Sequence, residues 1–203
     1  MPLIFQFGQT MPRTTTPKSA DRLTQHQRRL LRELEEITSL LKLDYRDIRS
    51  YEPAARTPLL ERMKRQFIIG EVITSYTLTD EHLNARIAQF FFGRKKSFIM
   101  LWKTKRFKVF NYHVLEELSL MAKLRFVKSI STVPKAVAAD IERLNALRNG
   151  LAHAFFPENL RRSKPEWKGK NIFTIEGLRA FLEDMTKIGA FFLHLSPEEL
   201  DIL

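Results

Sequence analysis

The sequence predicts an all-α protein, a helical bundle with an N-terminal helical arm. Two features favour helices over sheets. Only 7 of the 203 residues are glycine, and apolar residues recur along most of the chain at the three- and four-residue spacing of amphipathic helices. We expect no sheet and at most an isolated extended piece at residues 171–174. The length suits one domain with an appendage.

The first fifty residues are predicted to precede the main domain. Residues 1–20 contain a polar, proline-punctuated stretch, which predicts a flexible lead-in. Residues 21–52 form the predicted arm, whose apolar residues recur at steps of seven, four, three and four: Leu23, Leu30, Leu34, Ile37 and Leu41. This spacing fits a helix packed on its own domain and equally an arm that pairs with a second copy of the chain.

The main helical domain is predicted over residues 53–203, and prolines mark its first elements. Pro53 and Pro58 are expected to interrupt the chain, so that the first long helix begins at Pro58 and ends near Phe92. A weak point is expected at residues 77–80, where Thr79 is placed to cap a fresh start.

Three more helices are expected after this one. They cover residues 112–130, the segment from Pro134 to the turn before Pro157, and residues 175–194 behind the capping residue Thr174. Ser196 then begins a capping box for a short tail.

The amino-acid composition excludes several kinds of functional site. The chain has no cysteine, which excludes disulfide frameworks, cysteine-bound zinc and thiol nucleophiles. Its five histidines, at positions 26, 82, 113, 153 and 194, offer no two-histidine spacing on one helix, so we expect no metal and no cofactor. No apolar run is long enough for a membrane span, and we expect a cytoplasmic protein. A net charge of +11 favours a polyanionic partner, above all nucleic acid.

Positive charge is concentrated in residues 86–108, which contain eight basic and no acidic residues. Six aromatic residues are interleaved with them, a combination that suits phosphate contacts and base stacking in single-stranded RNA. With a second basic stretch, this predicts an RNA-binding surface of Arg94, Lys95, Lys96, Lys103, Lys105, Arg106, Lys108, Arg161 and Arg162. The alternative is that the aromatic residues belong to the core, as we expect for residues 90–92, and that the basic residues coat a loop.

The segment most informative about chemistry is residues 141–153, at the end of a predicted helix. It contains Arg148, Asn149, three further residues and then His153. This pattern, in an all-helical chain, resembles the signature of the HEPN superfamily, and the expected order of helices over residues 58–193 is similar to that fold.

The resemblance implies a function. Active HEPN proteins are metal-independent ribonucleases, usually dimers whose two motifs meet at the interface, and many act as toxins or in antiviral defence. His153 would then move protons to or from the RNA 2′-hydroxyl and the leaving oxygen. Arg148 would hold the scissile phosphate, and Asn149 would orient the phosphate or His153. The expected products are a 2′,3′-cyclic phosphate and a 5′-hydroxyl, and the implied partners are RNA, a second copy and an antitoxin or regulatory protein.

Helical geometry bears on this motif independently. One apolar arc is predicted on the motif helix: Val137, Ile141, Leu144, Leu147 and Leu151. At 100° per residue, His153 lies nearly opposite that arc, and Arg148 lies at its edge, about 140° from His153. One ideal helix cannot aim both at the same phosphate. Either the helix distorts at Gly150, or a second copy supplies the partner residue.

A non-catalytic interpretation uses the same residues. Arg148 would clamp a neighbouring helix, and His153 would complement the helix dipole. The mannitol-repressor family is similar around this motif and acts in regulation, so a silent regulator is the alternative function. Phe155 also departs from HEPN toxins paired with a nucleotidyltransferase antitoxin, in which a tyrosine two positions after the histidine is modified. Phenylalanine has no hydroxyl to modify, which argues against that covalent mode.

Overall fold

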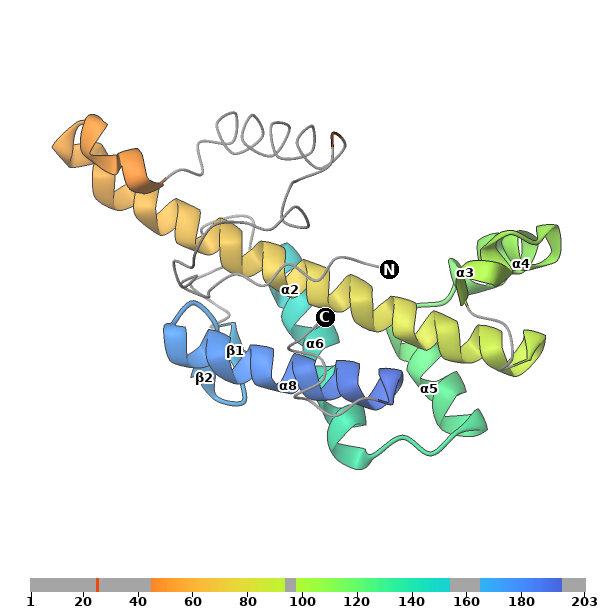
Figure 1. The fold of residues 1–203 in the computed structure, drawn as a ribbon. Helices are drawn as coiled ribbons and strands as arrows, with labels where there is room; N and C mark the ends of the chain where they lie inside the picture. The colour runs from red at the N-terminus through yellow and green to blue at the C-terminus, as the bar shows by residue number, and fades with distance from the viewer. Residues whose placement is uncertain (1–24, 26–44, 94–97, 154–164, 195–203) are drawn as a thin grey trace, which may run out of the picture. The chain divides into compact units, whose positions relative to one another are not determined.

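The computed structural model describes residue 25 and residues 45–93, 98–153 and 165–194. These residues are mostly helical, which confirms the predicted all-α class (Figure 1). The chain divides into two compact units, Met1–Lys64 and Arg65–Leu203, and the contacts discussed below belong to the second. The predicted lead-in, residues 21–24 and 26–44 of the arm and the predicted tail after residue 194 lie outside the described residues. The domain boundary between residues 52 and 53 stays a prediction.

The longest helix is α2, Pro53–Phe92, which follows the 3-10 helix η2, Tyr45–Ser50. The interruption expected at Pro58 is wrong, because the helix begins at Pro53 and continues through Pro58. Pro53 occupies the first helical position, where no N–H is needed, and Pro58 removes only one hydrogen bond from a 40-residue helix. The weak point is also wrong. Thr79 caps nothing, and its hydroxyl donates back to the carbonyl of Ser75 at 2.8 Å inside the continuing helix.

The chain after α2 folds into shorter elements than predicted. Helices α3, Phe98–Trp102, and α4, Lys105–Phe110, lead into the π-helical turn η3, Asn111–Leu115. Helix α5, Leu120–Ile130, then begins anew, so the single helix expected over residues 112–130 is wrong. Ser119 explains the new start, since its hydroxyl oxygen accepts the N–H of Ala122 at 3.3 Å as an N-cap.

The last two predicted helices are confirmed as α6, Lys135–His153, and α8, Ile175–Leu193. Thr174 caps α8 as expected, because its hydroxyl oxygen accepts the N–H of Gly177 at 3.1 Å. The isolated extended piece is wrong. Strand β1, Glu166–Trp167, pairs antiparallel with β2, Lys170–Asn171, in a hairpin beside the N-terminal end of α8 (Figure 1). Its turn places Lys168 and Gly169 at positive φ, a conformation that glycine accepts readily.

Two buried clusters hold the second unit together. The first joins the C-terminal half of α2 to α5 and to Phe192 at the end of α8. The second joins α2 to α6, the hairpin and Phe181 of α8. Tyr76 of α2 packs against both clusters. The apolar arc predicted on α6 is confirmed, with four members buried and Val137 partly buried against the first cluster.

Asp184 of α8 anchors the hairpin. The indole Nε1 of Trp167 donates to its carboxylate at 2.9 Å, the Nζ of Lys168 lies at 2.6 Å and that of Lys187 at 3.0 Å. Burial by itself would raise the pKa of Asp184, but these hydrogen bonds together lower it below its ordinary value. The ionised carboxylate therefore stabilises the contact between α8 and the hairpin.

Candidate functional site

The predicted motif occupies the last turns of α6, which is helical through His153. Arg148 and Asn149 are both exposed, and Arg148 lies at the edge of the arc that contains the buried Leu147 and Leu151. The Nη1 of Arg148 donates to Oδ1 of Asn149 at 3.2 Å, so the structure brings these two predicted residues together. His153 contributes the last helical backbone, and its side chain lies outside the described set. Gly150 is helical, so α6 has no break between Arg148 and His153.

Tyr76 is the partner of Arg148 that the sequence did not indicate. The guanidinium carbon of Arg148 lies 5.3 Å from the centroid of the Tyr76 ring, within the range of a cation–π contact. None of the ion pairs between described residues involves Arg148. Its positive charge is therefore held in place by an aromatic face and an amide, and remains available to an anion.

The pKa of the Tyr76 hydroxyl is affected by burial and by two charged neighbours. Burial raises its pKa above the ordinary value, Arg148 acts to lower it, and Asp80 adds to the rise. The net rise keeps Tyr76 protonated at neutral pH, as a neutral hydrogen-bonding group between a guanidinium and a carboxylate.

A cavity of about 320 Å³ adjoins Tyr76. Its walls come from α2, from Trp102 at the end of α3, and from the segment of η3 and α5. Tyr76, Asp80 and Asn84 form the α2 wall together with Glu81. The sequence carries a signal that we did not use, because Tyr76, Asp80 and Asn84 are spaced four apart and therefore share one face of a helix.

Buried polar groups distinguish this cavity. The ammonium of Lys123 lies 2.8 and 2.6 Å from the two carboxylate oxygens of Asp80, and its side chain is only 4% exposed. Asn84 is also buried, and its Nδ2 donates to Asp80 at 3.4 Å. Among the described residues, no donor reaches Oδ1 of Asn84. Buried acceptors without a donor are rare in native proteins, so this one needs an explanation.

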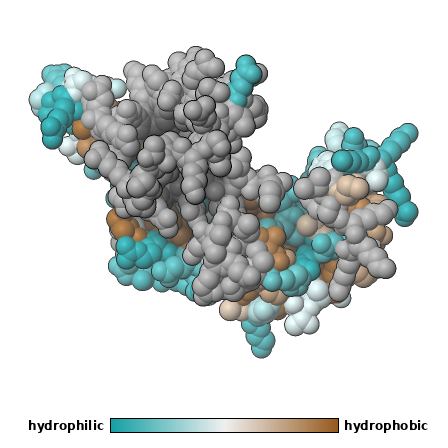
Figure 2. Space-filling model, viewed as in Figure 1, coloured by the Kyte–Doolittle hydropathy of each residue, from teal (hydrophilic) through white to brown (hydrophobic). Residues whose placement is uncertain are grey.

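The described part of the predicted RNA-binding surface lies on α4 and the turn before it. Lys103, Lys105, Arg106 and Lys108 are all exposed. The guanidinium carbon of Arg106 lies 5.4 Å from the ring centroid of Phe92. Figure 2 shows hydrophilic and hydrophobic side chains next to one another over this end of the unit. The structure thus groups four predicted cations, whereas Arg94, Lys95, Lys96, Arg161 and Arg162 lie outside its description.

Two expectations about the basic segment need correction. Phe90 and Phe91 are 59% and 49% exposed, so the core placement expected for residues 90–92 is wrong for both, whereas Phe92 packs against the first cluster. These two rings lie at the end of α2, where Phe126 of α5 contacts both of them and leaves each about half exposed. Arg86 does not share the surface of Lys103 to Lys108. Its Nη2 donates to the carbonyl of Phe192 at 3.0 Å and lies 2.7 Å from Nε2 of His194, because it caps the end of α8.

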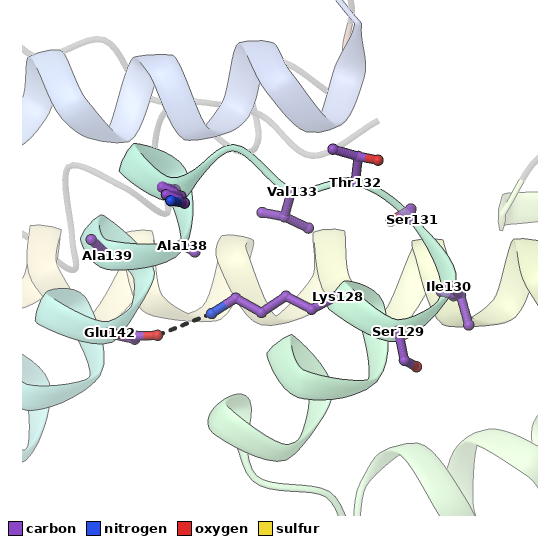
Figure 3. Close-up of a pocket in the computed structure, with 10 residues that line it drawn as sticks. Lys128, Ser129, Ile130, Ser131, Thr132, Val133, Ala138, Ala139 and Glu142 are labelled. Carbon is purple, nitrogen blue, oxygen red and sulfur yellow. Dashed lines mark hydrogen bonds and ion pairs between the residues drawn. The ribbon is translucent and has the colours of Figure 1, made fainter.

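A larger cavity, about 680 Å³, lies at the connection between α5 and α6 (Figure 3). The Nζ of Lys128 reaches across it to Glu142 at 3.2 Å, so these two charges satisfy each other. None of the predicted site residues lines it. We assign no chemistry to this cavity.

Neither known proteins nor possible metal ligands assign a function to this chain. No family model, no curated protein and no solved structure was found to match this chain. Within the described ranges, no three histidine, aspartate or glutamate side chains are grouped as a metal site, and none of the helices described there is long and apolar enough to cross a membrane. The functional argument therefore rests on the chain's own residues.

Proposed function

We propose that this protein is a metal-independent endoribonuclease of the HEPN type that acts as a homodimer. One observation carries the proposal. Arg148 is exposed at the end of α6, is oriented by Tyr76 and Asn149, and has no carboxylate partner among the described residues. An arginine held in this way is prepared for a phosphate, which it contacts through two parallel N–H groups.

The chemistry follows from the residue types. The RNA 2′-oxygen attacks the adjacent phosphorus, the new O2′–P bond forms, and the P–O5′ bond breaks. His153 takes the proton of the 2′-hydroxyl and, once protonated, gives a proton to the departing 5′-oxygen. Arg148 stabilises the negative charge that develops on the phosphoryl oxygens. The products are a 2′,3′-cyclic phosphate and a 5′-hydroxyl, and no metal or other cofactor takes part.

The basic surface supplies the second part of the proposal. Lys103, Lys105, Arg106 and Lys108 are exposed on α4 and the turn before it, and Phe110 of α4 contacts the exposed Phe91. Phosphates of flanking RNA would contact the cations, and unpaired bases would stack on the rings. The cellular setting that we propose is a cytoplasmic toxin or antiviral nuclease, restrained by an antitoxin or another regulatory protein.

Cleavage in a chelator tests the proposed function. Purified protein is incubated with a structured RNA in excess EDTA, and the product ends are analysed. We expect undiminished cleavage, 5′-hydroxyl ends and complete loss of activity in His153→Ala and Arg148→Ala. Arg179→Ala, at an exposed arginine of α8, is the control and should retain activity. Loss of cleavage in EDTA with recovery in magnesium would overturn the proposed chemistry.

A catalytically silent regulator is the second candidate function. It is favoured by the contact of Arg148 with Tyr76, because that contact also joins α6 to α2 as a helix clamp would. For a regulator, Arg148→Ala would lower the melting temperature and weaken partner binding, while the unmodified protein would cleave no RNA. The same assay therefore separates the two functions.

A further inference from the structure

The cavity beside Tyr76 has a lining rich in hydrogen-bond acceptors. Three carboxylates, those of Asp80, Glu81 and Glu116, face one ammonium, that of Lys123. Asp80 is occupied by Lys123, and Glu116 accepts the Nδ2 of Asn111 at 2.8 Å. The lining therefore favours a ligand that donates hydrogen bonds, and its excess of carboxylates disfavours a phosphate.

Asn84 gives the lining a specific polar contact. Its amide nitrogen is directed to Asp80, which leaves Oδ1 as a buried acceptor that no described donor reaches. The residue is only 5% exposed, so bulk water does not readily satisfy this atom. Because this atom has almost no accessible surface, an N–H group of a bound ligand would complete its hydrogen bonding once the amide turns toward the cavity.

Size and shape restrict the ligand further. A volume of about 320 Å³ is at the lower end of the range of small-molecule sites, which suits a single ring system. Tyr76 and Trp102 both line the cavity and offer aromatic faces. RNA-binding proteins read unstacked bases by stacking them on aromatic rings and by hydrogen bonds to their Watson–Crick edges.

Arg148 connects this cavity to the proposed phosphate site. Its guanidinium lies over the ring of Tyr76, and the same tyrosine lines the cavity. A nucleotide can therefore place its base in the acidic cavity and its phosphate on Arg148, with Tyr76 between the two subsites.

We propose that the cavity lined by Asn84, Asp80 and Trp102 binds the guanine base of the nucleotide whose phosphate contacts Arg148. This proposal rests on the proposed function, to which it adds a base preference. Guanine fits because its Watson–Crick edge presents two adjacent donors, N1–H and the 2-amino group, to a wall of oxygen acceptors. Adenine presents one donor and one acceptor on that edge, cytosine one donor beside two acceptors, and uracil one donor between two acceptors.

Two nucleotides that differ by one group test the inference. Guanosine 5′-monophosphate and inosine 5′-monophosphate are titrated into the full-length protein, and affinities are measured by NMR chemical shifts or calorimetry. We expect the guanine nucleotide to bind about tenfold more tightly, because inosine lacks the 2-amino donor. Equal affinities, or no binding of either nucleotide, would overturn the proposal. Competition by spermidine that removes the difference would also overturn it and identify a site for organic cations.

Variants locate the contact. Asn84→Leu should remove the preference for guanosine over inosine, and Asn84→Ala provides a second variant if leucine impairs folding. Ser75→Ala is the matched control, since Ser75 is a buried polar residue of the same helix that does not line the cavity. The control should retain the preference. A preference that survives in both folded Asn84 variants would contradict the placement.

The outcome is separable from that of the proposed function. RNA cleavage without base preference, with equal nucleotide affinities, would leave the nuclease and remove the guanine site. Guanine-selective binding without any RNA cleavage would leave the site and remove the nuclease.

Discussion

Arg148 of α6 lies with its guanidinium carbon 5.3 Å from the centroid of the Tyr76 ring on α2. The two residues are 72 positions apart in the sequence, and their contact joins the motif helix to a wall of the smaller cavity. Tyr76 therefore positions the arginine that would hold the phosphate in the proposed function. The contact also gives the arginine a structural role, so both RNA cleavage and the free energy of unfolding must be measured for variants of Arg148.

Mixed dimers test whether two chains build one site. Arg148→Ala and His153→Ala should each be inactive, because about 140° separates the two positions on one straight helix and each chain must contribute. Mixing the two variants should restore part of the activity if one Arg148 and one His153 from different chains suffice. Restoration is measured against each variant alone at the same total concentration. A site that needs all four residues would stay inactive, and full activity of the His153→Ala homodimer would contradict the nuclease assignment.

Gly150→Ala tests the alternative in which α6 bends. A Cβ at Gly150 would meet no atom within 4 Å, and the residue is helical. Alanine should therefore stabilise the protein by about 0.5–1 kcal/mol in urea unfolding, because glycine is costly within a helix. Cleavage should be retained. An inactive but well-folded Gly150→Ala protein would indicate that the helix must distort to unite Arg148 and His153 within one chain.

Salt dependence tests the basic surface of α4. Replacing Lys103, Lys105 and Lys108 with glutamine should weaken RNA binding and flatten its dependence on salt, by about 0.7 in the log–log slope for each lost phosphate contact. Fluorescence anisotropy over a series of salt concentrations measures this slope. Replacing Lys128, Lys135 and Lys187, which lie on other helices, gives a control of equal charge. An identical slope change in both triple variants would mean that the effect comes from net charge alone.

Thr174→Ala should reduce the free energy of unfolding by about 1 kcal/mol, the usual cost of losing an N-cap. Its hydroxyl accepts the N–H of Gly177 at 3.1 Å and donates to the carbonyl of Asn171 at 2.7 Å, so it also joins α8 to the hairpin. Thr186→Ala is the control, because the Thr186 hydroxyl bonds only within α8 in the described contacts. Equal losses in the two variants would contradict a capping role.

Asp184 should make folding sensitive to acid. Because its folded-state pKa is lowered, the ionised carboxylate stabilises the protein above the unfolded-state pKa of about 3.9, and this stabilisation is lost as the pH falls through the folded-state value. Asp184→Asn should cost about 1–3 kcal/mol at pH 7 and less at pH 3, which lies below the unfolded-state pKa. Urea unfolding at both pH values measures the difference. Glu183→Gln, at an exposed neighbour, should show no comparable dependence.

Local signals were sufficient for much of the fold. The apolar arc of α6 and the cap at Thr174 depend on residues within one or two turns, and both are confirmed. The errors also have local causes. The residues around Pro58, taken alone, predict the beginning of a helix. One missing hydrogen bond, however, does not end a helix of 40 residues. The division of residues 112–130 was missed because Ser119 was not recognised as an N-cap.

Part of the candidate site can likewise be predicted from the sequence, and part depends on how the helices pack. The spacing of Arg148, Asn149 and His153 is a property of the sequence, and so is the charge of residues 103–108. Which groups surround them is not, because Tyr76, Asp80 and Lys123 meet only when α2 packs against α5 and α6. Exposure of Phe90 and Phe91 likewise depends on which elements cover the end of α2.

The sequence by itself determined that the chain is helical, that it is basic without cysteine, and that a candidate catalytic motif ends one helix. Periodicity, capping and composition are encoded within a few residues of each position, so they can be read without a fold. Only the tertiary structure decided that Arg148 contacts Tyr76 and that the adjoining cavity is lined by Asn84, whose buried Oδ1 no donor reaches among the described residues. Those contacts join residues far apart in the chain, and their free energy arises from burial and hydrogen bonding that exist only after the helices have packed.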